Sequence, residues 1–186
     1  MADIKILGIP GSLRKNAYST GLLRAAVDVV PEDAKVEIAE IQGFPVFNQD
    51  EEGNPPEVVR RFKEKVRAAD AVLFSLNEHN YGLSAAEKNA LDWGSRPYPE
   101  SVWNGKPAGM MSASVGMIGG ARAQYELRQS MVFLNMFPIN RPEVIVGMAA
   151  QKFDASGHLT DQHALRFIHD HLVELVRYTR LLLRKT

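Results

Sequence analysis

Short apolar segments alternate with segments of helical spacing along the whole chain, and this alternation most constrains the fold. Five segments have the length and character of strands, namely residues 4–9, 36–41, 71–74, 106–111 and 143–146. Between them, apolar side chains recur every three or four residues, as on one face of a helix. Strands that alternate with helices form a parallel sheet with helices on its faces. The sequence therefore predicts a doubly wound, three-layer α/β sandwich.

The chain of 186 residues is long enough for one domain with a substantial core. A domain of this size buries about 70% of the surface that its unfolded chain exposes. Neither repeats nor linker-like segments divide the sequence, so we expect residues 1–186 to form a single domain. The first residues lack the pattern of a secretory signal, and no apolar run is long enough to cross a membrane. We therefore expect a soluble, cytoplasmic protein.

Charge and cysteine content exclude several classes of function. The sequence has 22 lysines and arginines against 22 aspartates and glutamates, so its formal net charge is zero. Binding to nucleic acid or to an anionic membrane surface normally uses an excess of positive charge, so we expect neither as a partner. Because the chain has no cysteine, thiolate nucleophiles, cysteine-ligated zinc and iron–sulfur clusters are excluded. Redox chemistry would require a bound organic cofactor.

The first candidate binding segment follows the first predicted strand. In doubly wound sheets, ligands bind beyond the carboxyl ends of the strands, where the strand order reverses. The first loop (residues 8–20) combines small residues, hydroxyls and Arg14 with the backbone N–H groups of a helix start, which suits a phosphate monoester. It matches neither GxGxxG nor the P-loop pattern. The alternative is an ordinary serine- or threonine-capped helix start.

Two further loops follow the third and fourth predicted strands. The second loop (residues 77–82) joins amide, carboxylate, imidazole and phenol groups, and a flat ring could stack on Tyr81 or His79. The third loop (residues 112–124) is rich in small residues, and Gly119 and Gly120 permit a positive φ before the next helix. Taken singly, the second loop could be a polar turn and the third a flexible loop with a helix cap.

Together, the three loops suggest flavin mononucleotide (FMN) as the cofactor. Its phosphate would bind the first loop, and its isoalloxazine ring would lie between the second and third loops. A five-stranded sheet of order 2-1-3-4-5 with FMN at its switch point is the flavodoxin-like arrangement. We therefore predict a flavodoxin-like sandwich with helices on both faces of a five-stranded parallel sheet.

No other pattern indicates a catalytic or metal site. Four histidines lie near the C-terminus, but His169 and His171 are two residues apart and so point to opposite faces of a helix. We expect partly exposed helix histidines there, without a metal. The GxSxG pattern of serine hydrolases is absent, because Ser12 and Ser114 both lack a glycine two residues before them.

Five short motifs occur in one order from the first strand to about Glu143. They are Gly11-Ser12-Leu13-Arg14, Glu78-His79-Asn80-Tyr81, Lys88-Asn89-Ala90-Leu91-Asp92-Trp93, Gly105-Lys106-Pro107 and Gly119-Gly120-Ala121-Arg122-Ala123-Gln124. This series closely resembles the NADPH-dependent FMN reductase family, which includes bacterial quinone, azo and chromate reductases of flavodoxin-like fold. Each motif is short, but their combination is specific.

The resemblance implies roles for individual residues. The FMN phosphate would be held by first-loop residues, through the side chains of Ser12, Arg14 and Ser19 and the backbone of Ala17 and Tyr18. The isoalloxazine would be bordered by residues of the other two loops: Glu78, His79, Asn80, Tyr81, Ser114, Gly119 and Gly120. The family forms dimers and often tetramers, which implies a homodimer or homotetramer with Arg122, Tyr125 and Glu143 near subunit contacts.

The sequence also departs from the family pattern at five positions. Serine is usual at position 17, asparagine at 19, proline at 77, tyrosine at 79 and an apolar residue at 87, where this chain has Ala17, Ser19, Asn77, His79 and Glu87. Because Ala17 has no hydroxyl, Ser19 would have to compensate in phosphate binding. The other changes bear on the environment of the flavin ring more than on flavin binding.

The resemblance implies an NAD(P)H-dependent, FMN-containing oxidoreductase. In a ping-pong cycle, hydride would pass from NADPH or NADH to FMN and then to a quinone, an azo compound, free flavin or a metal oxyanion such as chromate. No side chain need act as an essential acid, although Tyr81 or His79 could donate a hydrogen bond. The alternatives are a flavodoxin-like electron carrier, which the neutral charge disfavours, and a family member that serves as a binding module.

Overall fold

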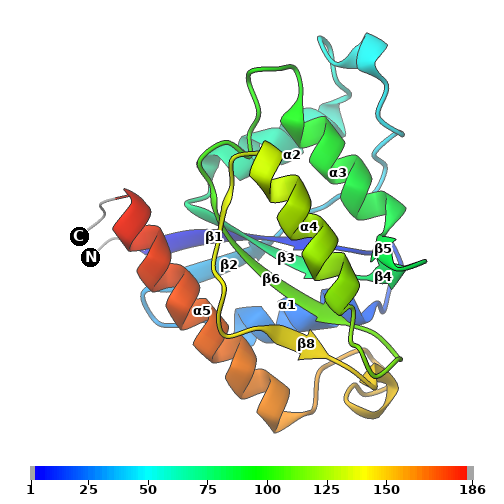
Figure 1. The fold of residues 1–186 in the computed structure, drawn as a ribbon, viewed down its shortest axis with the longest axis vertical. Coiled ribbons are helices and arrows are strands. Elements are labelled where there is room, and N and C mark those ends of the chain that lie inside the picture. Colours follow the sequence, from blue (N-terminus) through cyan, green and yellow to red (C-terminus); the bar gives the residue numbers. More distant parts are fainter. Residues whose placement is uncertain (1–2, 184–186) are drawn as a thin grey trace.

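A parallel sheet forms the middle layer of the computed structural model, which describes residues 3–183 (Figure 1). Its strands are β1 (Ile4–Pro10), β2 (Ala34–Ile38), β3 (Ala71–Leu76), β6 (Pro107–Ala113), β7 (Phe137–Pro138) and β8 (Val144–Val146). The order is β2-β1-β3-β6, and both β7 and β8 then pair with β6, all in parallel. The predicted α/β class and the 2-1-3-4-5 order are therefore confirmed.

Helices cover both faces of this sheet. They are α1 (Tyr18–Asp28), α2 (Glu57–Ala68), α3 (Ala85–Ser95), α4 (Ala121–Phe133) and α5 (Gln162–Leu183), with short 3-10 helices at Gln49–Glu51 and Ala149–Gln151. Helices α1 and α5 pack on one face, and α2, α3 and α4 pack on the other (Figure 1). Within residues 3–183, no helix is both long enough and apolar enough to span a membrane.

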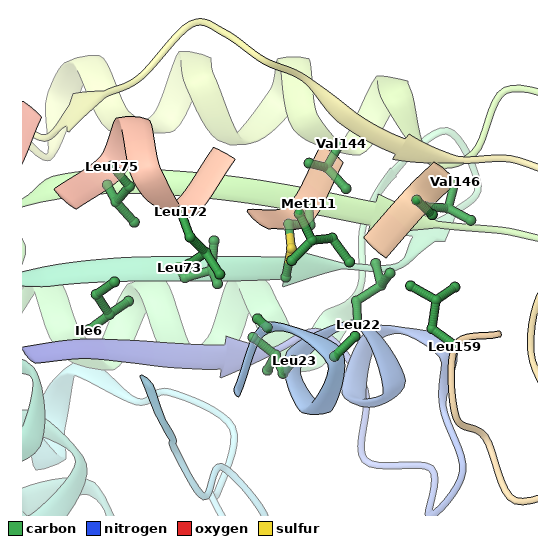
Figure 2. Close-up of a cluster of buried hydrophobic side chains, with 14 of the residues drawn as sticks. Ile6, Leu22, Leu23, Leu73, Met111, Val144, Val146, Leu159, Leu172 and Leu175 are labelled. Carbon is green, nitrogen blue, oxygen red and sulfur yellow. The ribbon is translucent and has the colours of Figure 1, made fainter. Parts of the chain in front are cut away.

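The two cores follow from the alternation of side chains along each strand. Ile6 and Leu73 point toward α1 and α5, and they belong to the same buried cluster as Leu22 and Leu172 (Figure 2). Leu7 and Phe74 point to the opposite core, under α2, α3 and α4. A strand that is covered on both faces must be apolar throughout, which explains the continuous apolar run of β3.

The edge of the sheet beyond β6 differs from the prediction. A single fifth strand was expected at residues 143–146, but β7 and β8 share this position, and residues 139–143 between them form no strand. Pro138 and Pro142 have no backbone N–H to donate to a neighbouring strand, which explains the interruption. The second strand also lies earlier than the predicted 36–41, because it pairs with β1 from Ala34 to Ile38.

His171 fills the gap between β7 and β8. Its Nε2 accepts a hydrogen bond from the backbone N–H of Met110 in β6 at 3.1 Å, so its Nδ1–H donates to the Pro142 carbonyl at 2.7 Å. The side chain is only 2% exposed, so the expectation of a partly exposed histidine is wrong here. Helix α5 can approach this closely because β6 has Gly109 next to the imidazole. The imidazole thus replaces a missing strand neighbour.

Burial lowers the pKa of His171 from 6.5 to about 4. The unfolded chain therefore binds one more proton at this residue between these two pH values, so the contribution of neutral His171 to stability is lost as the pH falls through this window. Relative to a His171→Gln variant, wild type should lose about 3 kcal/mol of unfolding free energy between pH 6.5 and pH 4. Urea unfolding of both proteins at several pH values measures this difference, and a constant difference would contradict the prediction.

Candidate functional site

The three predicted loops meet at one edge of the sheet. Strands β1, β3 and β6 are parallel neighbours, so their carboxyl ends lie side by side. Hydrogen bonds join the segments that follow them: Ser75 Oγ at the end of β3 donates to the carbonyl of Ser19 in α1 at 2.8 Å, and Ser84 Oγ donates to the carbonyl of Gly11 at 2.7 Å. The second loop is in turn attached to the start of α4, as described below.

The first loop ends in a helix start that no side chain caps. Ala17 is the N-cap residue of α1, and the first turn contains no acidic residue. The backbone N–H groups of such a helix start attract an anion. The Arg14 guanidinium lies 5.5 Å from the centre of the ring of Tyr18, which is the first residue of this helix. The hydroxyl oxygen of Ser12 accepts a hydrogen bond from the backbone N–H of Arg14 at 3.1 Å, which leaves its proton free to donate.

Ser19 is the most deeply buried of the predicted phosphate ligands. The residue lies in the first turn of α1, and its Oγ has no hydrogen-bond partner within residues 3–183. Buried hydroxyls are normally paired, so this atom lacks an acceptor of the kind that a phosphate oxygen provides. With the uncapped helix and Arg14, this orphaned hydroxyl fits the phosphate group of FMN.

The second loop is a β-hairpin and not an irregular polar turn. Strands β4 (Glu78–His79) and β5 (Gly82–Leu83) pair antiparallel, with Asn80 and Tyr81 at the tip. Both tip residues have a positive φ, 52° and 69°, as a two-residue type I′ turn requires. The Tyr81 side chain is 73% exposed and His79 is also exposed, so both rings are accessible at this edge of the sheet.

Helix α4 holds this hairpin in place (Figure 1). The Glu78 carboxylate accepts hydrogen bonds from the backbone N–H and from Nη1 of Arg122, both at 3.1 Å. The same guanidinium lies 4.0 Å from the centre of the Tyr81 ring. On the second strand, Leu83 N–H donates to Glu126 Oε2 at 2.7 Å. Within this chain, Arg122 therefore orders the predicted ring-binding residues, and Glu126 is a supporting residue that the sequence analysis missed.

The third loop places backbone where side chains would not fit. Gly119 and Gly120 have φ values of 63° and 88°, as predicted, and Gly120 caps α4. A Cβ atom on Gly119 would lie 2.7 Å from the backbone nitrogen of Gly147. Ser114 Oγ makes only a long hydrogen bond, 3.4 Å, to the Gly116 carbonyl, so its hydroxyl is weakly engaged.

Ser84 and Glu87 lie at the start of α3 and contact the first and second loops. Neither residue was assigned a role from the sequence. They form a capping box at the start of α3: Ser84 Oγ accepts from the Glu87 N–H, and Glu87 Oε2 accepts from the Ser84 N–H. The spacing Ser84-x-x-Glu87 is the sequence signal for this arrangement. Burial raises the pKa of Glu87 to about 8.

The structure thus brings the three predicted loops together at the carboxyl end of the sheet, whereas His171 of α5 lies beside Met110 in β6. Of the residues expected near subunit contacts, Tyr125 and Glu143 are exposed and lie outside these three loops. Within residues 3–183, no group of three histidine or carboxylate side chains is placed to hold a metal ion.

The sequence and the fold of this chain are similar to those of known proteins. The family described as NADPH-dependent FMN reductase matches residues 4–151. An NAD(P)H-dependent FMN reductase of Pseudomonas aeruginosa is 47% identical over 182 residues, which cover 97% of each chain. An NADPH:quinone oxidoreductase of Arabidopsis thaliana is 42% identical over 95% of this chain and 92% of its own. The solved structure of FerB, a flavoenzyme NAD(P)H:(acceptor) oxidoreductase from Paracoccus denitrificans, superposes with a TM-score of 0.86 at 29% identity, covering 96% of this chain and 98% of its own.

Proposed function

The chain belongs to the NADPH-dependent FMN reductase family, and on that basis we propose that it is an NAD(P)H-dependent, FMN-containing oxidoreductase that reduces small-molecule acceptors such as quinones. The observation that carries this proposal is the meeting of an anion-binding helix start and an ordered hairpin with exposed rings at one sheet edge. A phosphate and a flat ring, joined by a short chain, are the parts of FMN that such an edge would bind.

Different residues of this site would bind the phosphate and the ring of FMN. The helix start and Arg14 offset the negative charge of a phosphate, and Ser12 and Ser19 offer hydroxyl donors. The hairpin, held by Arg122 and Glu126, fixes the place of the ring. FMN, when bound, supplies the hydride-accepting and hydride-donating chemistry. Tyr81 and His79 stand at the open side, where either could donate a hydrogen bond to the nicotinamide or the acceptor.

The visible spectrum of the purified protein, before and after anaerobic NADPH, tests the proposal most directly. We expect bound flavin that NADPH bleaches and that a quinone restores, with steady oxidation of NADPH when quinone is in excess. Bound flavin without NAD(P)H turnover would instead indicate an electron carrier. Protein that stays colourless after incubation with FMN would indicate a binding module and would contradict the proposal.

Arg14→Ala should weaken FMN binding about tenfold or more, because a charge-assisted hydrogen bond to phosphate is lost. Titration of flavin-free protein with FMN, followed by flavin fluorescence, gives the dissociation constant. Arg177→Ala is the control, since Arg177 is an exposed cation that pairs with Glu174 on α5. Unchanged FMN affinity in Arg14→Ala would reject the first loop as the phosphate site.

We also propose finer features of this function. Azo compounds, free flavin and metal oxyanions such as chromate are further acceptors, because an open flavin face tolerates acceptors of varied shape. The chain would act as a homodimer or homotetramer with Arg122, Tyr125 and Glu143 near the contacts, and in the cytoplasm, where NAD(P)H is available. Light scattering tests the assembly, and a Tyr125→Ala variant tests the contact, because Tyr125 is 63% exposed in the single chain.

A further inference from the structure

A tight turn (residues 153–159) between the sheet and α5 packs against the first loop and α1. Phe153 and Leu159, at the two ends of the turn, form an antiparallel bridge. The Asp154 carboxylate accepts hydrogen bonds from two backbone N–H groups within the turn, both at 2.9 Å. These contacts give the turn a defined shape of its own.

Gly21 allows this turn to approach α1 closely. A Cβ atom at position 21 would overlap the Gly157 carbonyl oxygen and would lie 2.7 Å from the Phe153 ring. Glycine inside a helix is unfavourable, so its presence in α1 has a packing reason. Gly157 also faces Asn16, the residue before the N-cap of α1. The turn therefore contacts both the first loop and the helix that follows it.

The Phe153 ring supports the side chain of Tyr18. Phe153 is 8% exposed and belongs to the core between α1, α5 and the sheet. The centres of the two rings are 4.9 Å apart, with an angle of 50° between their planes, which is a favourable tilted contact. The Arg14 guanidinium lies 5.5 Å from the centre of the same Tyr18 ring. Phe153, Tyr18 and Arg14 thus form one series of contacts that ends at the proposed phosphate site.

No polar contact fixes the position of the Arg14 side chain. Arg14 is exposed, and within residues 3–183 its guanidinium takes part in no hydrogen bond or ion pair. A long side chain without partners samples many rotamers, and restricting them on binding lowers affinity. Contact with an aromatic ring restricts the cation before a ligand arrives. The Tyr18 ring can do this only while it is itself held in place.

We propose that Phe153 is a positioning residue for FMN binding: through the Tyr18 ring, it holds the Arg14 guanidinium where the flavin phosphate binds. This inference rests on the proposed function. Because Phe153 acts through Arg14, it affects the affinity for a flavin that carries a phosphate. Loss of the ring at position 153 should raise the dissociation constant for FMN about three- to fivefold, as expected for loss of a cation–π contact.

FMN titrations of flavin-free wild type, Phe153→Leu and Phe62→Leu, followed by flavin fluorescence, test this proposal. Leucine keeps an apolar side chain at position 153 but offers no ring to Tyr18. Phe62 is the matched control, because it is also buried and pairs with another ring, that of Phe44, but lies in the opposite core. We expect the rise in the dissociation constant for Phe153→Leu and a change of less than about twofold for Phe62→Leu. Urea unfolding checks that both variants are folded.

A double-mutant cycle gives a readout that a general loss of structure would not produce. If Phe153 acts through Arg14, then Phe153→Leu should not weaken FMN binding further in an Arg14→Ala background. Riboflavin provides a second comparison, because it has the ring and the sugar chain of FMN but no phosphate. Wild type and Phe153→Leu should bind riboflavin with equal affinity.

The outcomes separate this inference from the proposed function. Unchanged FMN affinity in Phe153→Leu would overturn the role of Phe153 alone. An equal weakening of FMN binding in the wild-type and Arg14→Ala backgrounds, or an equal weakening for FMN and riboflavin, would also overturn it. Wild-type protein that binds no FMN would overturn the proposed function, and this inference with it.

Discussion

Gly11→Ala should remove tight FMN binding and lower the free energy of unfolding by about 3 kcal/mol. The new methyl group would overlap Glu87 Oε1 and would lie 2.6 Å from the Ser75 carbonyl oxygen and 2.8 Å from the Asn77 nitrogen. Two of these three neighbours are backbone atoms of β3 and the segment after it, so no rotamer change can relieve the overlap. The first loop must move away from β3, which separates the proposed phosphate site from the proposed ring site.

The expected loss of FMN affinity is about 100-fold or more, because misplacing a preorganised loop removes several contacts at once. Fluorescence titration with FMN and urea unfolding measure the two effects. Gly53→Ala is the matched control, since a Cβ atom there meets nothing within 4 Å. If Gly11→Ala kept wild-type affinity, the flavin phosphate would not depend on the position of the first loop.

His171→Ala should lower the free energy of unfolding by about 4 kcal/mol without touching the flavin site. The substitution leaves a cavity in the core between α5 and the sheet, and it leaves Met110 N–H and the Pro142 carbonyl without their partner. A buried polar group without a hydrogen-bond partner destabilises the folded state by its full desolvation free energy. Denaturant unfolding at pH 7.5, where the wild-type imidazole is neutral, measures the loss.

His169→Ala is the control, because His169 lies two residues away on the same helix and is exposed. It makes one hydrogen bond, from Nδ1 to the Val29 carbonyl, and its removal should cost no more than about 1 kcal/mol. Equal losses in the two variants would show that the imidazole does not replace a strand neighbour. A large loss of FMN affinity in folded His171→Ala would show that the contacts around His171 affect the three loops at the carboxyl end of the sheet.

The sequence predicts the layers well because they depend on burial. β3 is buried at every residue, and its apolar run is visible without any structure. The fifth strand is harder to predict, since the group that bonds β6 where this strand is interrupted is a histidine that comes 28 residues after Glu143. Periodicity shows which residues of α5 face inward, but it cannot show that one of them meets an unpaired backbone group.

The arrangement of the three loops at the carboxyl end of the sheet could be predicted from the sequence only in part. Arg14 and Gly120 belong to loops whose composition already suits a ligand, whereas the hairpin tip uses Tyr81 at positive φ, which side-chain preferences disfavour. Its geometry comes from contacts with Glu126 and Arg122 on α4, which no local pattern reveals. Glu87 is intermediate, because its capping box is visible in the sequence while its contact with Gly11 is not.

The uncapped start of α1 makes folding and cofactor supply interdependent. Most helices carry their own N-cap, worth about 1 kcal/mol, but Ala17 provides none, and water must serve the exposed N–H groups until an anion arrives. A ligand that binds only the folded chain stabilises it in proportion to the logarithm of its concentration. With FMN phosphate bound at this helix start, as we propose, a shortage of flavin would lower the stability of the chain, and the abundance of the protein would then depend on flavin supply even at constant synthesis.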